Sequence, residues 1–183
     1  MLVDIPFGSV EAFRFVKDNN LKLQAVLLTH GHFDHCGGVQ EMLGRLGLAD
    51  IPIYAHEADY SLCHKASQNR WGVHCQDCFP THPIVEGPLD VGDFSFQVLE
   101  TPGHTVGSVV YLIDRLIISG DTLFQRSVGR IDFAESKPHL LVSSLKKIKA
   151  LSGDYAVICG HGPNTTLESE KKFNPYLQHE TIY

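Results

Sequence analysis

Three histidines and one aspartate fall within six positions of this sequence, directly after a largely apolar segment at 21–29. The apolar run predicts a buried strand, and the segment after the donors has helical spacing. The donors therefore lie in a turn between a strand and a helix. Alternate side chains in a tight turn point to similar sides, so we expect His30 and His32 to share one ion. Asp34 and His35 then serve a neighbouring ion, and zinc, manganese or iron suits such donors.

Three later strand-like runs also end in turns that carry a metal-binding side chain. Those side chains are His104, Asp121 and His161, and each has a glycine beside it, which lets the backbone turn sharply. Ligands that follow several strands converge on one rim of a sheet, where α/β proteins place their sites. The pattern therefore predicts one metal centre, with the ligands His30, His32, Asp34, His35, His104, Asp121 and His161.

The remaining histidines and the cysteines lack this setting. A single histidine at a strand end is more often capped or solvated than a ligand, so we expect ordinary roles for His56, His64, His74, His82, His139 and His179. Cys75 and Cys78 form a C-x-x-C pair flanked by His74 and His82, a spacing that a small zinc site can have. A lone pair of this kind is a weak indication, and we expect an ordinary reduced loop.

Charge and composition argue against several classes of protein. Fifteen basic and 21 acidic side chains give a net charge of −6, which disfavours a nucleic-acid partner. The longest apolar runs are far shorter than the roughly 20 residues of a membrane helix, and no signal peptide is visible. Five cysteines without a disulfide spacing indicate a reducing cytoplasm. We expect a cytoplasmic protein that binds neither nucleic acid nor membrane; its oligomeric state is left open.

Strand-like and helix-like segments alternate along the chain, which predicts an α/β layered fold in a single domain over residues 1–183. Residues 57–88 are the least patterned and are expected to be a covering loop. Ser9 is expected to cap the first helix. The expected helices are 9–20, 39–46 and 138–151, and the expected strands are 2–5, 21–29, 51–55, 94–100, 108–113, 116–119 and 155–159.

Four ordered motifs cover nearly the whole chain. They read His30-x-His32-x-Asp34-His35, Thr-Pro-Gly-His104-Thr-x-Gly-Ser, Ser-Gly-Asp121-Thr-Leu-Phe and Gly-His161-Gly-Pro. This set resembles the metallo-β-lactamase superfamily, specifically the glyoxalase II-like hydrolases of the short bacterial type. The resemblance implies an αββα sandwich, with two sheets face to face and helices outside.

The resemblance also implies roles for the ligands. It places His30, His32 and His104 at a first ion and Asp34, His35 and His161 at a second. Asp121 bridges the two ions, and Asp34 and Asp121 are the expected catalytic carboxylates. Asp4 lies where the family has an Asp-Pro-Gly turn, whose aspartate supports the metal ligands without binding the metal itself. The turn here reads Asp-Ile-Pro-Phe-Gly.

Two departures from the family pattern concern the ends of the chain. An additional N-terminal β segment normally precedes the turn at Asp4, so we expect a sheet shortened at the N-terminus. Full-length relatives carry a C-terminal helical domain that grips glutathione. Without it we expect a high KM for S-lactoylglutathione, a respectable kcat and tolerance of other thiols, because remote binding lowers KM without raising kcat.

The expected reaction is hydrolysis of a small-molecule thioester such as S-lactoylglutathione. Two divalent ions, with zinc first and iron or manganese as alternatives, lower the pKa of a bound water and stabilise the oxyanion formed by its attack. A thiolate leaving group with a pKa of about 8.5 needs little help from an acid. Arg126 and Arg130 are candidates to bind a substrate carboxylate; an internal salt bridge, for instance of Arg130 with Asp132, is the equal alternative.

Other functions remain open at this point. A mononuclear iron persulfide dioxygenase shares the His-x-His-x-Asp-His run and a Gly-Arg-x-Asp-Phe segment, but the retained His161 favours two metals. A non-catalytic metal-binding product of a truncated gene is a second alternative. A β-lactamase is less favoured, because those enzymes commonly place a cysteine in the second site. A nuclease is not supported by the charge.

Overall fold

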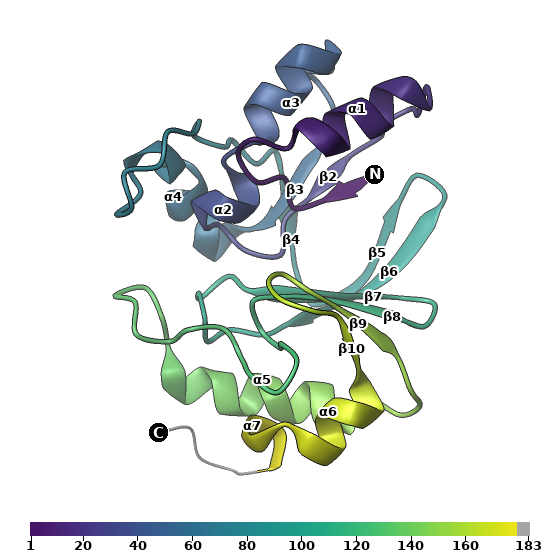
Figure 1. Ribbon diagram of the computed structural model, residues 1–183, viewed down its shortest axis with the longest axis vertical. Helices are drawn as coiled ribbons and strands as arrows, with labels where there is room; N and C mark the ends of the chain where they lie inside the picture. The colour runs from purple at the N-terminus through teal and green to yellow at the C-terminus, as the bar shows by residue number, and fades with distance from the viewer. Residues whose placement is uncertain (179–183) are drawn as a thin grey trace. The chain divides into compact units, whose positions relative to one another are not determined.

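The computed structural model describes residues 1–178, so His179 lies outside the described part. The chain divides into two compact units, Met1–Ile84 and the part from Val85 onward (Figure 1, purple to blue and teal to yellow). Each unit combines one sheet with helices, as the alternation of strand-like and helix-like segments predicts. None of the helices in this described part is both long and apolar enough to cross a membrane.

The first unit contains a four-stranded, all-parallel sheet in the order β1-β2-β3-β4. Its strands are β1 (Leu2–Val3), β2 (Val26–Leu27), β3 (Ile53–His56) and β4 (His82–Ile84). Its helices are α1 (Val10–Asp18), α2 (Phe33–Cys36), α3 (Val39–Leu46) and α4 (Tyr60–Cys63), with 3₁₀ turns η1 (Glu57–Asp59) and η2 (Ala66–Gln68).

The core of the first unit lies around β2, whose two residues are completely buried. α1 and α3 turn their apolar sides inward, burying residues such as Val16 and Met42. Ser9 lies at the start of α1 as predicted, but the prediction that its side chain caps the helix is wrong. Its hydroxyl donates a 2.6 Å hydrogen bond to the Pro6 carbonyl oxygen and accepts none from the helix.

The region 57–88, expected to be a covering loop, is more structured than its sequence pattern indicates. It contains α4, both 3₁₀ turns and β4, and the first residues of β5. These elements have three to five residues, too few for a helical or strand period to be visible.

The second unit contains a six-stranded sheet in the order β10-β9-β8-β7-β6-β5. Strands β5 to β8 form an antiparallel meander, and β9 pairs parallel to β8 after a crossover that contains α5. The sheet and the helices after it are β5 (Gly87–Val91), β6 (Phe94–Glu100), β7 (Val109–Ile113), β8 (Leu116–Gly120), α5 (Pro138–Ala150), β9 (Ala156–Cys159), β10 (Thr165–Thr166), α6 (Leu167–Phe173) and α7 (Pro175–Gln178).

The topology of this sheet brings three strand ends to one edge. β8 and β9 run in the same direction and are in register at Gly120 and Cys159, so the residues that follow them begin side by side. β6 runs parallel to β8 because β7 lies antiparallel to both. α5 packs its buried residues Leu141, Leu145 and Ile148 into the apolar core of this unit.

Candidate metal centre

The first unit gathers four of the predicted ligands in the turn after β2 and the one-turn helix that follows it. The residues His30, His32 and His35 are nearly buried, with 2%, 8% and 3% of their surface exposed. The His30 ring centroid lies 4.9 Å from that of His32 and 4.1 Å from that of His35. Asp34 lies beside His35 on the one-turn helix α2 and is half-buried. Four donors therefore crowd into one turn.

Asp4 orients two of these imidazoles. Its carboxylate accepts hydrogen bonds from the Thr29 backbone N–H (2.8 Å) and hydroxyl (2.7 Å), and pairs with His35 Nδ1 at 2.8 Å. The Thr29 hydroxyl also lies 3.1 Å from His30 Nδ1. Contacts at Nδ1 direct the opposite nitrogen, Nε2, away from Asp4, as in the supporting shell of a metal site. Asp4 adopts φ +52°, a region that aspartate and asparagine tolerate better than most residues.

A further carboxylate, which sequence reasoning missed, supports the same turn. Asp59 is 1% exposed and accepts a 2.9 Å hydrogen bond from the backbone N–H of Gly31, between His30 and His32. A β-carbon at Gly31 would lie 2.7 Å from the Asp59 carbonyl oxygen, so only glycine fits this approach. No motif marks Asp59, because it lies in the unpatterned region that begins at residue 57.

The second unit gathers the other three predicted ligands. His104 Nε2 lies 3.5 Å and His161 Nε2 lies 3.6 Å from the same atom, Asp121 Oδ2. These separations are long for hydrogen bonds. Two ligand atoms that each lie ~2.1 Å from one tetrahedral ion are about 3.4 Å apart. Two imidazole nitrogens and one carboxylate oxygen at these distances fit divalent metal ions.

The surroundings of His104 fix its orientation. Its Nδ1 lies 2.7 Å from the Arg130 carbonyl oxygen, which turns Nε2 toward Asp121. The buried Ser136 hydroxyl donates a 2.7 Å hydrogen bond to the His104 carbonyl oxygen, and the Phe133 ring meets the imidazole edge to face. Ser136 is a second residue that no sequence signal marked.

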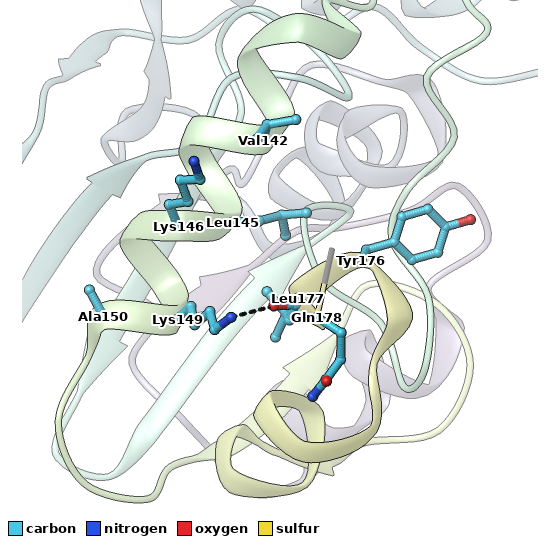
Figure 2. Close-up of a pocket in the computed structure, with 8 residues that line it drawn as sticks. All are labelled: Val142, Leu145, Lys146, Lys149, Ala150, Tyr176, Leu177 and Gln178. Carbon is cyan, nitrogen blue, oxygen red and sulfur yellow. Dashed lines mark hydrogen bonds between the residues drawn. The ribbon is translucent and has the colours of Figure 1, made fainter. Parts of the chain in front are cut away.

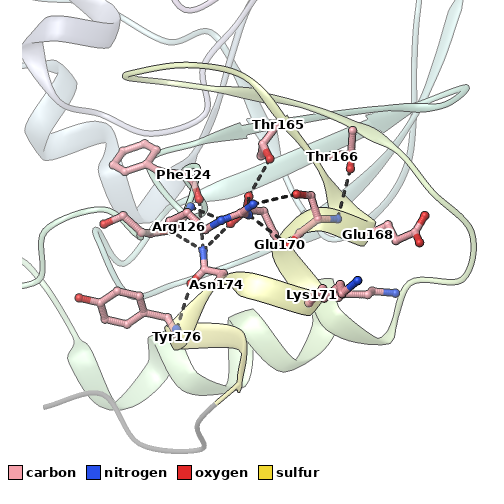
Figure 3. Close-up of polar contacts among 12 residues, drawn as sticks. Phe124, Arg126, Thr165, Thr166, Glu168, Glu170, Lys171, Asn174 and Tyr176 are labelled. Carbon is pink, nitrogen blue, oxygen red and sulfur yellow. Dashed lines mark hydrogen bonds and ion pairs between the residues drawn. The ribbon is translucent and has the colours of Figure 1, made fainter.

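The two arginines predicted to bind substrate both form internal ion pairs. Arg126 Nη1 lies 2.5 Å from Glu170 Oε1 (Figure 3). Arg130 binds Asp132 through two contacts, 3.0 and 2.7 Å, in which both side chains are 64% exposed. These are the salt bridges left as the alternative. The exposed pair of Arg130 leaves its guanidinium accessible to solvent, and substrate binding by either arginine stays a prediction.

Glu170, which the sequence analysis did not single out, is completely buried at the centre of a polar network (Figure 3). Besides Arg126 Nη1, its carboxylate accepts hydrogen bonds from the Arg126 backbone N–H (2.7 Å), the Thr165 hydroxyl (2.6 Å) and Asn174 Nδ2 (2.9 Å). Asn174 Nδ2 also donates to the carbonyl oxygens of Phe124 and Ser127. The network ties the segment after Asp121 to α6.

The cysteines form no second metal site in the described residues. Cys75 Sγ donates to the Ala66 carbonyl oxygen, and Cys78 is buried in the core of the first unit. Contacts with the thiols of Cys63 and Cys78, followed by burial, raise the pKa of the Cys36 thiol well above its usual value. The Cys36 thiol is therefore protonated at neutral pH.

A pocket of about 350 Å³ lies in the second unit between α5 and α7 (Figure 2). Leu145, Lys149 and Leu177 are among the residues that line it, and the Lys149 ammonium donates a 2.7 Å hydrogen bond to the Leu177 carbonyl oxygen. None of the predicted ligands lines it. This pocket is therefore separate from the candidate centre.

Comparison with known proteins gives one family match and close relatives. A family model described as "Metallo-beta-lactamase superfamily" matches residues 3–161. The "Probable metallo-hydrolase YqgX" of Bacillus subtilis (strain 168) is 36% identical over 172 residues, which are 90% of this chain and 80% of the relative. The "Hydroxyacylglutathione hydrolase GloC" of Haemophilus influenzae is 33% identical over 182 residues, 94% of this chain and 84% of the relative.

Solved structures with the same fold confirm the α/β architecture of two sheets with helices. TTHA1623 "in a di-iron-bound form" superposes with a TM-score of 0.87 at 36% identity, over 96% of this chain and 88% of that one. The "BLEG-1 B3 metallo-beta-lactamase" superposes with a TM-score of 0.88 at 34% identity, over 97% and 88%.

Proposed function

Because the chain belongs to the metallo-beta-lactamase superfamily of metal-dependent hydrolases, we propose that it hydrolyses a small-molecule thioester of the S-lactoylglutathione type. The observation that carries the metal-dependent part is the approach of the His104 and His161 imidazoles to one oxygen of Asp121. The name of the relative GloC, hydroxyacylglutathione hydrolase, supports the thioester.

We further propose that the ligands of both units serve one pair of divalent ions. His30, His32 and His104 would hold the first ion, and the second would be held by Asp34, His35 and His161, with Asp121 bridging. Zinc is the first candidate, and the di-iron-bound form of TTHA1623 supports iron as the alternative. Imidazole and carboxylate ligands suit both metals.

The residues divide the work of such a site. When bound, the ions would lower the pKa of a water molecule and stabilise the charge that develops on the substrate carbonyl. Asp34 and Asp121 supply the negative charge that holds the ions, and Asp4 and Asp59 keep the imidazole turn in place. A thiolate with a pKa of about 8.5 leaves without a protonating side chain.

Purified protein, prepared without added metal, tests the proposal. Metal content is measured by mass spectrometry, and hydrolysis of S-lactoylglutathione is followed before and after chelation. We expect about two metal ions per chain and an activity that chelation removes and metal restores. Metal-loaded protein that is inert toward a panel of thioesters would contradict the thioesterase proposal and favour a non-catalytic metal-binding protein.

A second candidate is β-lactam hydrolysis, because BLEG-1, named a B3 metallo-beta-lactamase, is 34% identical over nearly the whole chain. A cephalosporin in the same assay tests it. Oxygen uptake with glutathione persulfide tests the dioxygenase alternative. We expect the highest kcat/KM with the thioester, and a higher value for either other substrate would reassign the reaction.

Asp4→Asn is expected to weaken metal binding about 10- to 100-fold, the usual cost of losing a residue that orients a ligand. Asparagine tolerates φ +52°, so the backbone stays in place, while its amide cannot supply the charge that pairs with His35. Competition with a chromogenic chelator measures the affinity. Asp18→Asn, at the exposed end of α1, is the matched control. Equal affinities in the two variants would show that Asp4 does not support the site.

A further inference from the structure

Three aromatic rings stack on the surface of the first unit and form what we call the aromatic ladder: Phe7, Phe33 and Trp71. The rings of Phe7 and Phe33 are 5.9 Å apart and nearly parallel, with an angle of 15°. The rings of Phe33 and Trp71 are 5.2 Å apart at 34°. Phe7 is 41% exposed, Trp71 is 50% exposed and Phe33 is half-buried. The ladder is therefore one apolar surface open to solvent.

The ladder adjoins the turn that carries the candidate ligands. Phe33, its central ring, is the first residue of α2 and stands between His32 and Asp34 in the chain. A substrate group that rests on this ring would lie on a residue whose two neighbours in the chain are proposed metal ligands. The ladder thus continues the proposed site along the surface of the first unit.

Backbone hydrogen bonds hold the outer rings beside α2. The Ile5 N–H donates to the His35 carbonyl oxygen (2.7 Å), and the Gly38 N–H donates to the Ile5 carbonyl oxygen (3.0 Å), which anchors the segment carrying Phe7. The Gln76 N–H donates to the Gly37 carbonyl oxygen (3.1 Å) and anchors the segment carrying Trp71. Both anchors lie at the C-terminal end of α2.

The loop at Trp71 is also braced internally. The Asn69 side chain donates to the Val73 carbonyl oxygen (2.8 Å) and accepts from the Val73 backbone N–H (3.0 Å). The Arg70 guanidinium lies 5.2 Å from the Trp71 ring centroid, a cation–π distance. A surface fixed in advance loses less entropy when a ligand binds to it.

Single exposed aromatic residues are common, but a contiguous apolar patch beside a polar site marks a place where a ligand binds. Resting on our proposed function, we propose that the aromatic ladder binds an apolar group of the thioester substrate, on either its acyl or its thiol side. The preferred substrates are then thioesters with an alkyl or aromatic group, in addition to small polar ones.

Fluorescence of Trp71, the single tryptophan of the chain, reports binding to the ladder without any hydrolysis. The probes are two thioethers that cannot be hydrolysed, S-methylglutathione and S-hexylglutathione. We expect the hexyl compound to change the emission and to bind at least about tenfold more tightly than the methyl compound, because it buries more methylene groups.

Two phenylalanine variants provide the comparison. Phe7→Ala is expected to remove most of the preference for the hexyl compound. Phe15→Ala, which truncates a 63% exposed ring on α1, should leave it intact. Equal affinities for the two thioethers would overturn the proposal. So would emission that changes with protein concentration alone, which would make the ladder a contact between copies of the chain.

Kinetics then identify the side of the thioester that the ladder binds. The acyl arm compares hexanoyl and acetyl thioesters of glutathione, and the thiol arm compares lactoyl thioesters of benzyl mercaptan and glutathione. In one arm, Trp71→Ala should raise KM for the apolar substrate about tenfold with a smaller effect on kcat, and Trp71→Phe should restore it. No change in either arm would overturn the proposal. Inactive protein that still prefers S-hexylglutathione would contradict the thioesterase function alone.

Discussion

Asp121→Ala is expected to lower kcat/KM for the thioester by at least about a thousandfold, or ~4 kcal/mol of transition-state stabilisation. The carboxylate is the point on which the His104 and His161 imidazoles converge, at 3.5 and 3.6 Å. As the proposed bridge, it would hold both ions and fix their spacing. Its loss is expected to cost more activity than any other ligand change, whereas His161→Ala should mainly weaken the second ion.

Asp132→Ala is the matched control for Asp121→Ala. Asp132 lies in the same unit, but its carboxylate is 64% exposed and pairs with Arg130. Steady-state kinetics and metal analysis by mass spectrometry are measured on both variants. Full activity with two tightly bound metal ions in the Asp121 variant would rule out a bridging role.

Glu170→Ala is expected to lower the free energy of unfolding by about 3 kcal/mol, because several hydrogen-bond donors lose their buried acceptor. Arg126 is 41% exposed, so water can solvate its guanidinium after the change. Most of the lost free energy comes from two donors that no longer have a carboxylate partner, the Thr165 hydroxyl and the Asn174 amide. Urea denaturation, followed by circular dichroism, measures the effect.

Two further variants isolate the cause of this loss. Glu168→Ala truncates an exposed glutamate of the same helix and should change the unfolding free energy by less than about 0.5 kcal/mol. Glu170→Gln keeps a hydrogen-bond acceptor without the charge and should fall between the two. Equal stability of the two alanine variants would show that the Glu170 network contributes nothing net.

Long, strongly patterned elements were predictable from the sequence. The strand at 94–100 has the predicted bounds, and the helix predicted at 138–151 is α5, one residue shorter. The strand predicted at 21–29 is present only as β2, two residues long. Its neighbours in the sheet pair with only those two positions, so Leu23 and Leu28 are buried without lengthening the ladder. Burial alone does not define a strand.

The metal-binding side chains in the turns could be predicted from the sequence, whereas the residues that stabilise those turns could not. His30 and Asp121 belong to clusters of metal-binding side chains at strand ends, a local pattern. Asp59 is 28 residues from the Gly31 N–H that it accepts, and Glu170 is 44 residues from Arg126. A single carboxylate in a polar segment belongs to no sequence pattern, periodic or spaced, that indicates such a distant partner. These contacts become visible only when the fold brings the segments together.

The two sheets differ in how the chain connects neighbouring strands, and this difference bears on the order of folding. In the second unit, β5 to β8 are neighbours in sequence, and each pairs antiparallel with the next without a crossover. In the first unit every neighbouring pair of strands is parallel, so two strands can pair only after the crossover segment between them has brought their ends together. Local pairings form faster than distant ones, because less chain entropy is lost before the first contacts form. The half of the protein that leaves the ribosome first is therefore the half whose sheet is expected to form more slowly.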